Sequence, residues 1–162
     1  MLRLTDTKDF WKKRIDEAIN YCKDIRFSVY WVRKDEWSRI NDVHAGLFKK
    51  LIPRTVKVLD AGCGYGRWAK FFPKTRYTGV DFSPEFLEIA RKENPEHNFI
   101  EADLAKLPFK DGEFSWAFCI SIKEMVSARN PEAWPPMLQE LKRVAKKVLI
   151  LEYTNPNLYE IL

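Results

Sequence analysis

The sequence predicts an α/β fold in which a doubly wound parallel sheet of five strands lies between two layers of helices, after an N-terminal helical segment. From residue 55 onward, short apolar runs alternate with stretches of helical periodicity. Several of these runs are apolar on both faces, which is typical of parallel strands covered by helices on each side. The 162 residues suffice for one well-packed domain and are too few for two ordinary ones.

Residues 1–54 predict two amphipathic helices that form a lid segment, and residues 55–162 predict the core of the same compact domain. Apolar side chains recur every three or four positions in each helix, and Pro53 ends the second one. His44 lies on the apolar stripe, so we expect a buried, hydrogen-bonded histidine rather than a base. The periodic positions are Trp11, Ile15, Ala18, Cys22 and Ile25, then Trp37, Ile40, His44, Leu47 and Leu51.

The core begins at a β-branched run and is expected to hold its strands at residues 56–59, 77–80, 98–100, 115–120 and 148–151. A glycine-rich turn and a short helix over 67–72 separate the first two strands. Ser83 can cap the next helix, with Pro84 in its first turn. A further helix before the last strand is marked by Met137, Leu138, Leu141 and Val144.

Composition excludes several classes of protein. No run of 18 apolar residues occurs, so no membrane span is predicted, and the N-terminus lacks a secretory signal. The three cysteines, Cys22, Cys63 and Cys119, are far apart and odd in number, which predicts neither disulfides nor a metal site and favours a reducing cytoplasm. Residues 1–60 hold 14 Lys and Arg against 9 Asp and Glu, an excess that can attract phosphates.

Acidic residues follow three predicted strands, where a doubly wound sheet binds its ligand. Asp60 precedes a Gly-x-Gly-x-Gly turn, Asp81 can accept hydrogen bonds from two ribose hydroxyls, and Asp103 can accept an adenine amino group. A nicotinamide dinucleotide fits poorly, because Arg67 stands where its fingerprint needs a third glycine and Asp60 would repel a pyrophosphate. A ligand with a sulfonium and an α-amino group fits this carboxylate better.

At these positions the chain resembles the class I S-adenosylmethionine-dependent methyltransferases, most closely the small-molecule branch. The resemblance covers about residues 55–153 and implies a Rossmann-like fold, S-adenosylmethionine as cofactor and S-adenosylhomocysteine as product. The matching segments are Val58-Leu59-Asp60-Ala61-Gly62-Cys63-Gly64-Tyr65-Gly66, Gly79-Val80-Asp81-Phe82-Ser83, Glu101-Ala102-Asp103-Leu104 and Leu138-Gln139-Glu140-Leu141-Lys142-Arg143-Val144.

The resemblance also implies which residues bind the cofactor. Asp60, Gly62, Cys63 and Gly64 lie along the methionine part, and Asp81 binds the ribose. Phe82, Asp103 and Leu104 surround the adenine, and Ile120 and Ser121 flank the methyl donor. In this family the segment before the first strand commonly closes over the cofactor, which suggests Tyr21, Tyr30 and Arg33 as lid residues, with Arg33 on the methionine carboxylate.

Two departures from the family leave the chemistry open. Ile122-Lys123-Glu124-Met125 stands where some members carry a histidine, so the candidate bases are Glu124, Glu152 and Tyr153 at strand exits. The sixth and seventh strands of the family have no sequence to form them, so the fifth strand is expected to be an exposed edge unless the tail or a second chain, as in a homodimer, covers it. A small-molecule methyltransferase, an RNA or DNA methyltransferase using the basic N-terminal third, and a non-catalytic cofactor-binding module all remain open.

Overall fold

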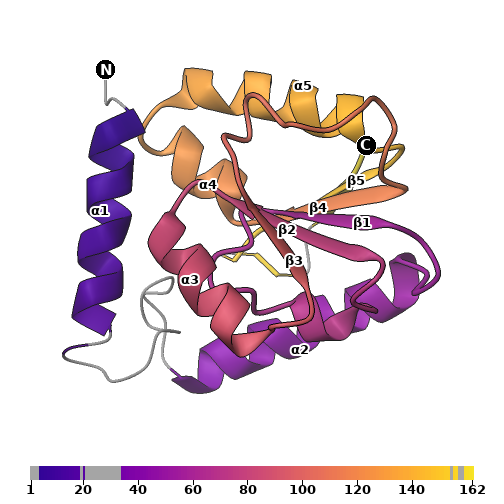
Figure 1. Ribbon diagram of the computed structural model, residues 1–162, viewed down its shortest axis with the longest axis horizontal. Helices are drawn as coiled ribbons and strands as arrows, with labels where there is room; N and C mark the ends of the chain where they lie inside the picture. The colour runs from indigo at the N-terminus through magenta and orange to yellow at the C-terminus, as the bar shows by residue number, and fades with distance from the viewer. Residues whose placement is uncertain (1–3, 19, 21–33, 154, 157–158) are drawn as a thin grey trace.

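The computed structural model describes residues 4–18, 20, 34–153, 155–156 and 159–162. Its centre is a six-stranded sheet in the order β3-β2-β1-β4-β5-β6 (Figure 1). The first five strands are parallel, and β6 runs antiparallel to β5. The strands are β1 (Val58–Ala61), β2 (Tyr77–Asp81), β3 (Asn98–Glu101), β4 (Trp116–Ile120), β5 (Val148–Leu151) and β6 (Tyr159–Ile161). The order reverses between β1 and β4, so the predicted doubly wound fold is confirmed.

Helices cover both faces of the sheet and make two apolar clusters. One face packs against α2, α3 and the 3-10 helix η3, and the other packs against α5 and the segment between β3 and β4. In Figure 1, α1 stands at the left beside α3, and Trp11 contacts Phe86 there with ring centroids 5.9 Å apart. The helices are α1 (Leu4–Glu17), α2 (Lys34–Leu51), η3 (Ala69–Phe71), α3 (Pro84–Glu93), α4 (Ile122–Ser127), η4 (Pro131–Ala133) and α5 (Trp134–Val144).

The expectation of five strands is wrong, and the C-terminal tail covers the edge of β5, as one of the expected alternatives allowed. Tyr159–Ile161 forms β6, which pairs with β5 in the register Leu149↔Ile161. Two hydrogen bonds of 2.9 Å between the backbones of Val148 and Leu162 extend the pairing. Three residues at a strand's edge give almost no apolar pattern in a sequence, which is why this strand was missed. The homodimer expected at the edge of β5 therefore loses its structural basis.

Other elements differ from the prediction by small shifts. Ser83 caps α3 as expected, because its Oγ accepts a hydrogen bond of 3.3 Å from the Phe86 N–H. The helix predicted over 67–72 is only the 3-10 turn η3, and α4 was not predicted. Of the first helix's stripe, Cys22 and Ile25 lie outside the described residues. Within the described part of the chain, no helix is both long and apolar enough to span a membrane.

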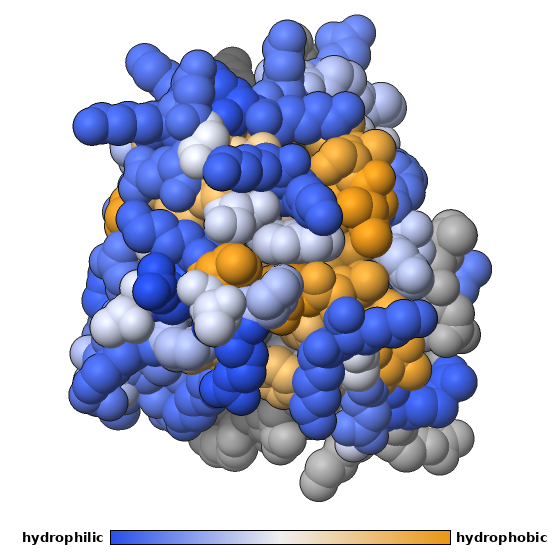
Figure 2. Space-filling view, turned by 90° about the vertical axis from the view of Figure 1, so that its right-hand side faces the viewer, coloured by the Kyte–Doolittle hydropathy of each residue, from blue (hydrophilic) through white to orange (hydrophobic). Residues whose placement is uncertain are grey.

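The five parallel strands begin at the right of Figure 1, where Leu162 bonds to the start of β5. Figure 2 shows this face, on which apolar surface is exposed between hydrophilic side chains. Ile161 and Leu162 are 44% and 42% exposed and are the large apolar side chains most open to solvent among the described residues. The carboxyl ends of the parallel strands lie on the opposite side, beside α1, α3 and α4.

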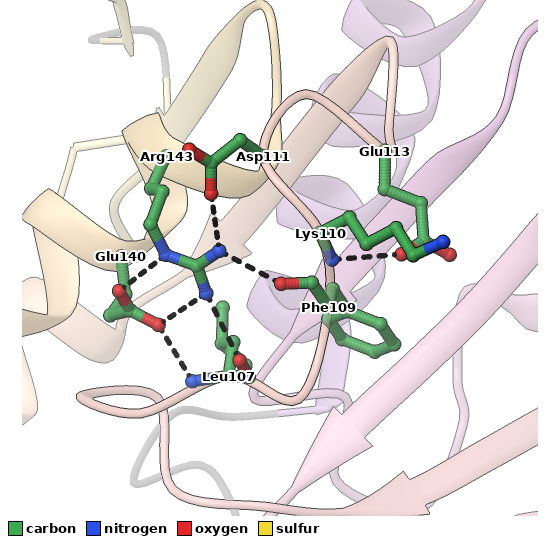
Figure 3. Close-up of polar contacts among 7 residues, drawn as sticks. All are labelled: Leu107, Phe109, Lys110, Asp111, Glu113, Glu140 and Arg143. Carbon is green, nitrogen blue, oxygen red and sulfur yellow. Dashed lines mark hydrogen bonds and ion pairs between the residues drawn. The ribbon is translucent and has the colours of Figure 1, made fainter.

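Arg143 of α5 holds the segment between β3 and β4 in place (Figure 3). Its guanidinium donates to both carboxylate oxygens of Glu140, at 2.7 and 2.8 Å, and to the carbonyl oxygens of Leu107 and Phe109, at 3.0 and 2.8 Å. It also bonds Asp111 at 2.8 Å, while Glu140 accepts from the Leu107 N–H at 2.8 Å. One planar side chain thus fixes a loop that has little regular structure of its own.

We expect Arg143→Lys to lower the free energy of unfolding by about 1–3 kcal/mol, because an ammonium cannot serve both backbone carbonyls and the two Glu140 oxygens at once. Urea unfolding followed by circular dichroism measures the change. Lys142→Ala, at the exposed neighbouring position, is the control and should leave stability nearly unchanged. Equal stability of Arg143→Lys and the wild type would show that the five contacts contribute little.

Candidate active site

A cavity of about 340 Å³ opens at the carboxyl ends of the strands, a volume within the usual range of small-molecule sites. Side chains of α1, α3 and α4 form its outer wall, and the strand ends form its floor. The wall contains all the residues from the core that were predicted to bind the cofactor, namely Asp60, Gly62, Cys63, Gly64, Asp81, Phe82, Asp103, Leu104, Ile120 and Ser121. Sequence patterns separated by up to sixty residues thus meet in one place.

The glycine turn after β1 brings backbone against the cavity. Gly62 and Gly64 have φ angles of 76° and 53°, a left-handed conformation that costs glycine nothing. The Gly64 N–H donates to Asp81 Oδ2 at 2.8 Å. A side chain at Gly64 would meet no atom within 4 Å and would project into open space, whereas one at Gly62 would overlap Ile122. Gly64 therefore leaves room for a ligand to lie directly on the backbone.

Asp81 ends β2 and is 6% exposed. Its Oδ1 accepts from the Ser83 N–H at 3.0 Å, and its Oδ2 accepts from Gly64. Burial raises the pKa of Asp81, and these backbone hydrogen bonds oppose that effect. Each oxygen retains a second lone pair, so the carboxylate can still accept from two hydroxyl groups of a ligand.

Asp60 is the last residue but one of β1 and is 2% exposed. Burial raises its pKa to about 7, against the hydrogen bond from Tyr77 and the charge of Arg67. The Tyr77 hydroxyl donates to Asp60 Oδ2 at 2.7 Å. A buried carboxylate with so high a pKa is poised to receive a cation, which would compensate its lost hydration.

Tyr77 is a site residue that sequence analysis missed. It begins β2 and pairs with Val58 in the register of the two strands. Its hydroxyl bonds Asp60, which lies two residues beyond Val58 along β1. At a strand rise of about 3.3 Å per residue, a tyrosine side chain is long enough to cover this distance. Only the register of β1 against β2 could have indicated it.

The segment after β3 supplies the next part of the wall. Asp103 Oδ1 accepts from the Ala105 N–H at 2.9 Å, which turns the chain, and Leu104 is buried beside it. The apolar outer wall also includes residues that no sequence pattern singled out for this site. Among them are Trp11, Phe86, Met125, Val126 and Met137.

Ser121 follows β4 and has an unusual backbone. Its φ of 61° and ψ of 5° make it the residue other than glycine with positive φ among those described. It stands at the start of α4 without capping it, and its buried Oγ has no hydrogen-bond partner within the described residues. A strained, unsatisfied polar residue in a cavity wall points to a ligand contact.

The remaining predicted residues have other positions. Tyr30 and Arg33, with Tyr21, lie outside the described residues. Glu124, Glu152 and Tyr153 do not line the cavity, but Arg67 does, and its guanidinium donates to the Tyr153 hydroxyl at 2.9 Å. Burial raises the pKa of the Cys63 thiol in the cavity wall. Among the described residues, no group of three or more His, Cys, Asp or Glu side chains is arranged to hold a metal ion.

Comparison with known proteins gives concordant matches. The family model described as "Methyltransferase domain" matches residues 58–148. The demethylmenaquinone methyltransferase of Chlorobaculum tepidum is 35% identical over 96 residues, covering 57% of this chain and 38% of that protein. The tRNA (carboxymethyluridine(34)-5-O)-methyltransferase of Saccharomyces cerevisiae is 34% identical over 83 residues, covering 51% of this chain and 30% of its own length.

A solved structure of a Pyrococcus horikoshii OT3 protein superposes with a TM-score of 0.61 at 26% identity, covering 74% of this chain and 59% of that one. The chain spans less than half the length of the two curated relatives. The family match nevertheless extends over most of the sheet, from β1 to the start of β5. The chain therefore belongs to the methyltransferase-domain family, as its resemblance to the class I S-adenosylmethionine-dependent methyltransferases predicted.

Proposed function

We propose that this chain binds S-adenosylmethionine and catalyses transfer of its methyl group to a small-molecule acceptor. The observation that carries the proposal is the row of Asp60, Asp81 and Asp103 at one cavity, beside the backbone of Gly64. A cavity of 340 Å³ suits a ligand of nucleoside size, and the buried Asp60 suits a cationic one. The quinone methyltransferase among the relatives supports a small acceptor.

In this proposal each part of the cavity has its own role. Asp81 accepts from the ribose hydroxyls, Asp103, Leu104 and Phe82 surround the adenine, and Asp60 with the Gly62–Gly64 turn holds the methionine part. Ile120 and Ser121 lie at the sulfur end. When bound, the sulfonium supplies a methyl group that is already electrophilic. The protein's contribution is therefore alignment of the two reactants and exclusion of water by the apolar wall.

A nucleic-acid acceptor is the second candidate. Lys49, Arg54 and Lys70 border a hollow of about 400 Å³, and Lys49 and Arg54 belong to the N-terminal third that holds the basic excess of the sequence. Clustered cations can bind the phosphates of a nucleic acid. The tRNA methyltransferase among the relatives supports this reading. Binding that weakens steeply with salt would distinguish it from a small-molecule enzyme.

Calorimetric titration with S-adenosylmethionine and S-adenosylhomocysteine tests the proposal. We expect one site with a Kd in the micromolar range, followed by release of S-adenosylhomocysteine when acceptors are supplied. Absence of binding by correctly folded protein would refute the proposal. Binding of both ligands without turnover on small-molecule or RNA acceptors would identify a non-catalytic cofactor-binding module instead.

Ser121→Gly and Ser121→Ala form a matched pair, because both remove the hydroxyl but only glycine relieves the backbone. We expect Ser121→Gly to raise the free energy of unfolding by up to about 1 kcal/mol relative to Ser121→Ala. Both variants should lower turnover several-fold, because the hydroxyl is proposed to contact bound ligand. Denaturant unfolding and steady-state kinetics measure the two effects. Unchanged turnover in both variants would show that the Ser121 hydroxyl does not contact the bound ligand and that the residue has only a structural role.

A further inference from the structure

Two glutamates meet beyond the ends of β4 and β5, next to the cavity. Glu152 directly follows β5, and Glu124 lies in the first turn of α4. Their carboxyl groups share a hydrogen bond, and Glu124 Oε2 also accepts from the Tyr153 N–H at 2.9 Å. Two carboxyl groups in contact cannot both be ionised without a proton or another cation between them. Glu152 Oε2 is buried and receives no hydrogen bond from the described residues.

Unsatisfied polar groups surround the same place. Ser121 is 7% exposed, Trp68 is 6% exposed and His44 is fully buried. Within the described residues, Ser121 Oγ and Trp68 Nε1 have no hydrogen-bond partner. His44 is fully buried, as expected, and a hydrogen bond to the backbone of Glu152 opposes the lowering of its pKa by burial. Buried polar atoms are almost always paired, so a cluster without partners indicates a site whose occupant supplies them.

The pair adjoins the end of the cavity at which Ile120 and Ser121 lie. The Ser121 N–H donates to the Leu151 carbonyl at 2.8 Å, which brings the cavity wall next to the residue before Glu152. Trp68 lines the cavity and packs beside His44, with ring centroids 6.4 Å apart. His44 in turn meets the Tyr153 ring edge-on at 5.7 Å. Ser121 and Trp68 therefore connect the cavity with the glutamates.

We infer that the Glu124–Glu152 pair binds the ammonium group of an amine acceptor and that Glu152 takes its proton. This inference rests on the proposed methyl transfer and names its substrate class. One N–H proton passes to Glu152, and the freed nitrogen lone pair forms the new N–C bond. The S–C bond breaks at the same time, and its electron pair stays on sulfur. The methylated amine leaves as a cation and the cofactor as a neutral thioether.

Charges around the pair favour this role. Burial, followed by the contact with Glu124, raises the pKa of Glu152 to about 7, with Glu160 of β6 adding to it and Lys123 of α4 opposing it. On α2, burial lowers the pKa of His44 to about 4, with Arg67 adding to the effect, so its imidazole is neutral and brings no competing cation. Near neutral pH, Glu152 can therefore both attract an ammonium group and hold its proton. Acceptors bearing a carboxylate would be repelled.

The test uses methylammonium as the probe and the side-chain carboxyl ¹³C resonance of Glu152 as the reporter. In protein saturated with S-adenosylhomocysteine, the resonance should titrate near neutral pH, and methylammonium should lower its midpoint by about one pH unit or more. Tetramethylammonium at equal ionic strength has no N–H and should have little effect. Glu152→Gln removes the resonance and so assigns it.

Matched variants make the outcome decisive. Glu124→Gln should lower the midpoint of Glu152 and abolish the response to methylammonium. Glu160→Gln, at the exposed partner of Lys123, should preserve that response. An equal response to both cations, or an unchanged one in Glu124→Gln, would overturn the inference. Cofactor binding is measured by calorimetry on the same sample, so its failure, which refutes the proposed function, is recognised separately.

Discussion

Asp81→Ala is expected to weaken S-adenosylmethionine binding by at least about a hundredfold, because two hydrogen bonds from ribose hydroxyls to a buried carboxylate are lost. The substitution also leaves the Gly64 and Ser83 N–H groups, now 2.8 and 3.0 Å from Asp81, without an acceptor. The glycine turn that carries the methionine part should then lose its anchor. The effect therefore exceeds the loss of ligand contacts alone.

Calorimetry at constant pH measures the change in Kd, and circular dichroism confirms that the variant is folded. Glu101→Gln is the matched control, because Glu101 ends β3 opposite Asp81 in the sheet register and is exposed outside the cavity. It should bind like the wild type. Asp81→Asn should fall in between, because an amide can accept from only one of the two backbone donors. If the folded Asp81→Ala variant bound the cofactor normally, the ribose would not be bound at Asp81.

Asp60→Asn is expected to stabilise the free protein and to impair cofactor binding. The pKa of Asp60 is raised from 3.8 to about 7, so an ionised Asp60 costs about 2–4 kcal/mol of folding free energy at pH 8. Asparagine has nearly the same shape, can still accept from the Tyr77 hydroxyl and cannot ionise. The methionine part carries the cationic groups that an ionised Asp60 would attract. Loss of the negative charge at position 60 should therefore weaken cofactor binding at least tenfold.

The direction of the pH dependence follows from proton binding. Between pH 4 and 7 the folded protein holds a proton on Asp60 that the unfolded chain has released, so this group's contribution to stability falls as pH rises through that range. The gain in Asp60→Asn should therefore be largest above pH 8 and vanish below pH 4. Urea unfolding at several pH values measures it, with Asp42→Asn at an exposed site of α2 as control. A variant less stable than the wild type at pH 8 would contradict the assignment of this cost to burial.

The cavity floor was predictable because its signals are local in the chain. Asp60 and Asp81 directly follow apolar runs, Asp103 comes three residues after one, and parallel strands place such residues at one edge of the sheet. Ser83 was predictable for the same reason, since a cap depends on its own helix. Local patterns thus located the strand ends and ten residues of the cavity wall.

The rest depended on contacts between distant segments. Arg143 meets Leu107 and Phe109 across more than thirty residues, and Tyr77 meets Asp60 through the strand register. β6 is three residues long, so its pairing with β5 leaves no periodicity to detect. The neighbours of His44 also depend on tertiary packing, because its apolar stripe predicted burial but not the contacts with Trp68 and Tyr153.

Two buried thiols in the described part of the chain can report separate opening motions of the molecule. Cys63 lines the cavity, whereas Cys119 lies fully buried in β4, and burial raises the pKa of both. Only the thiolate reacts with an alkylating reagent, so each must first be exposed by an opening motion. Alkylation of Cys63 reports opening of the glycine turn, and that of Cys119 reports unfolding of the sheet. An occupant of the cavity would therefore slow the first reaction far more than the second.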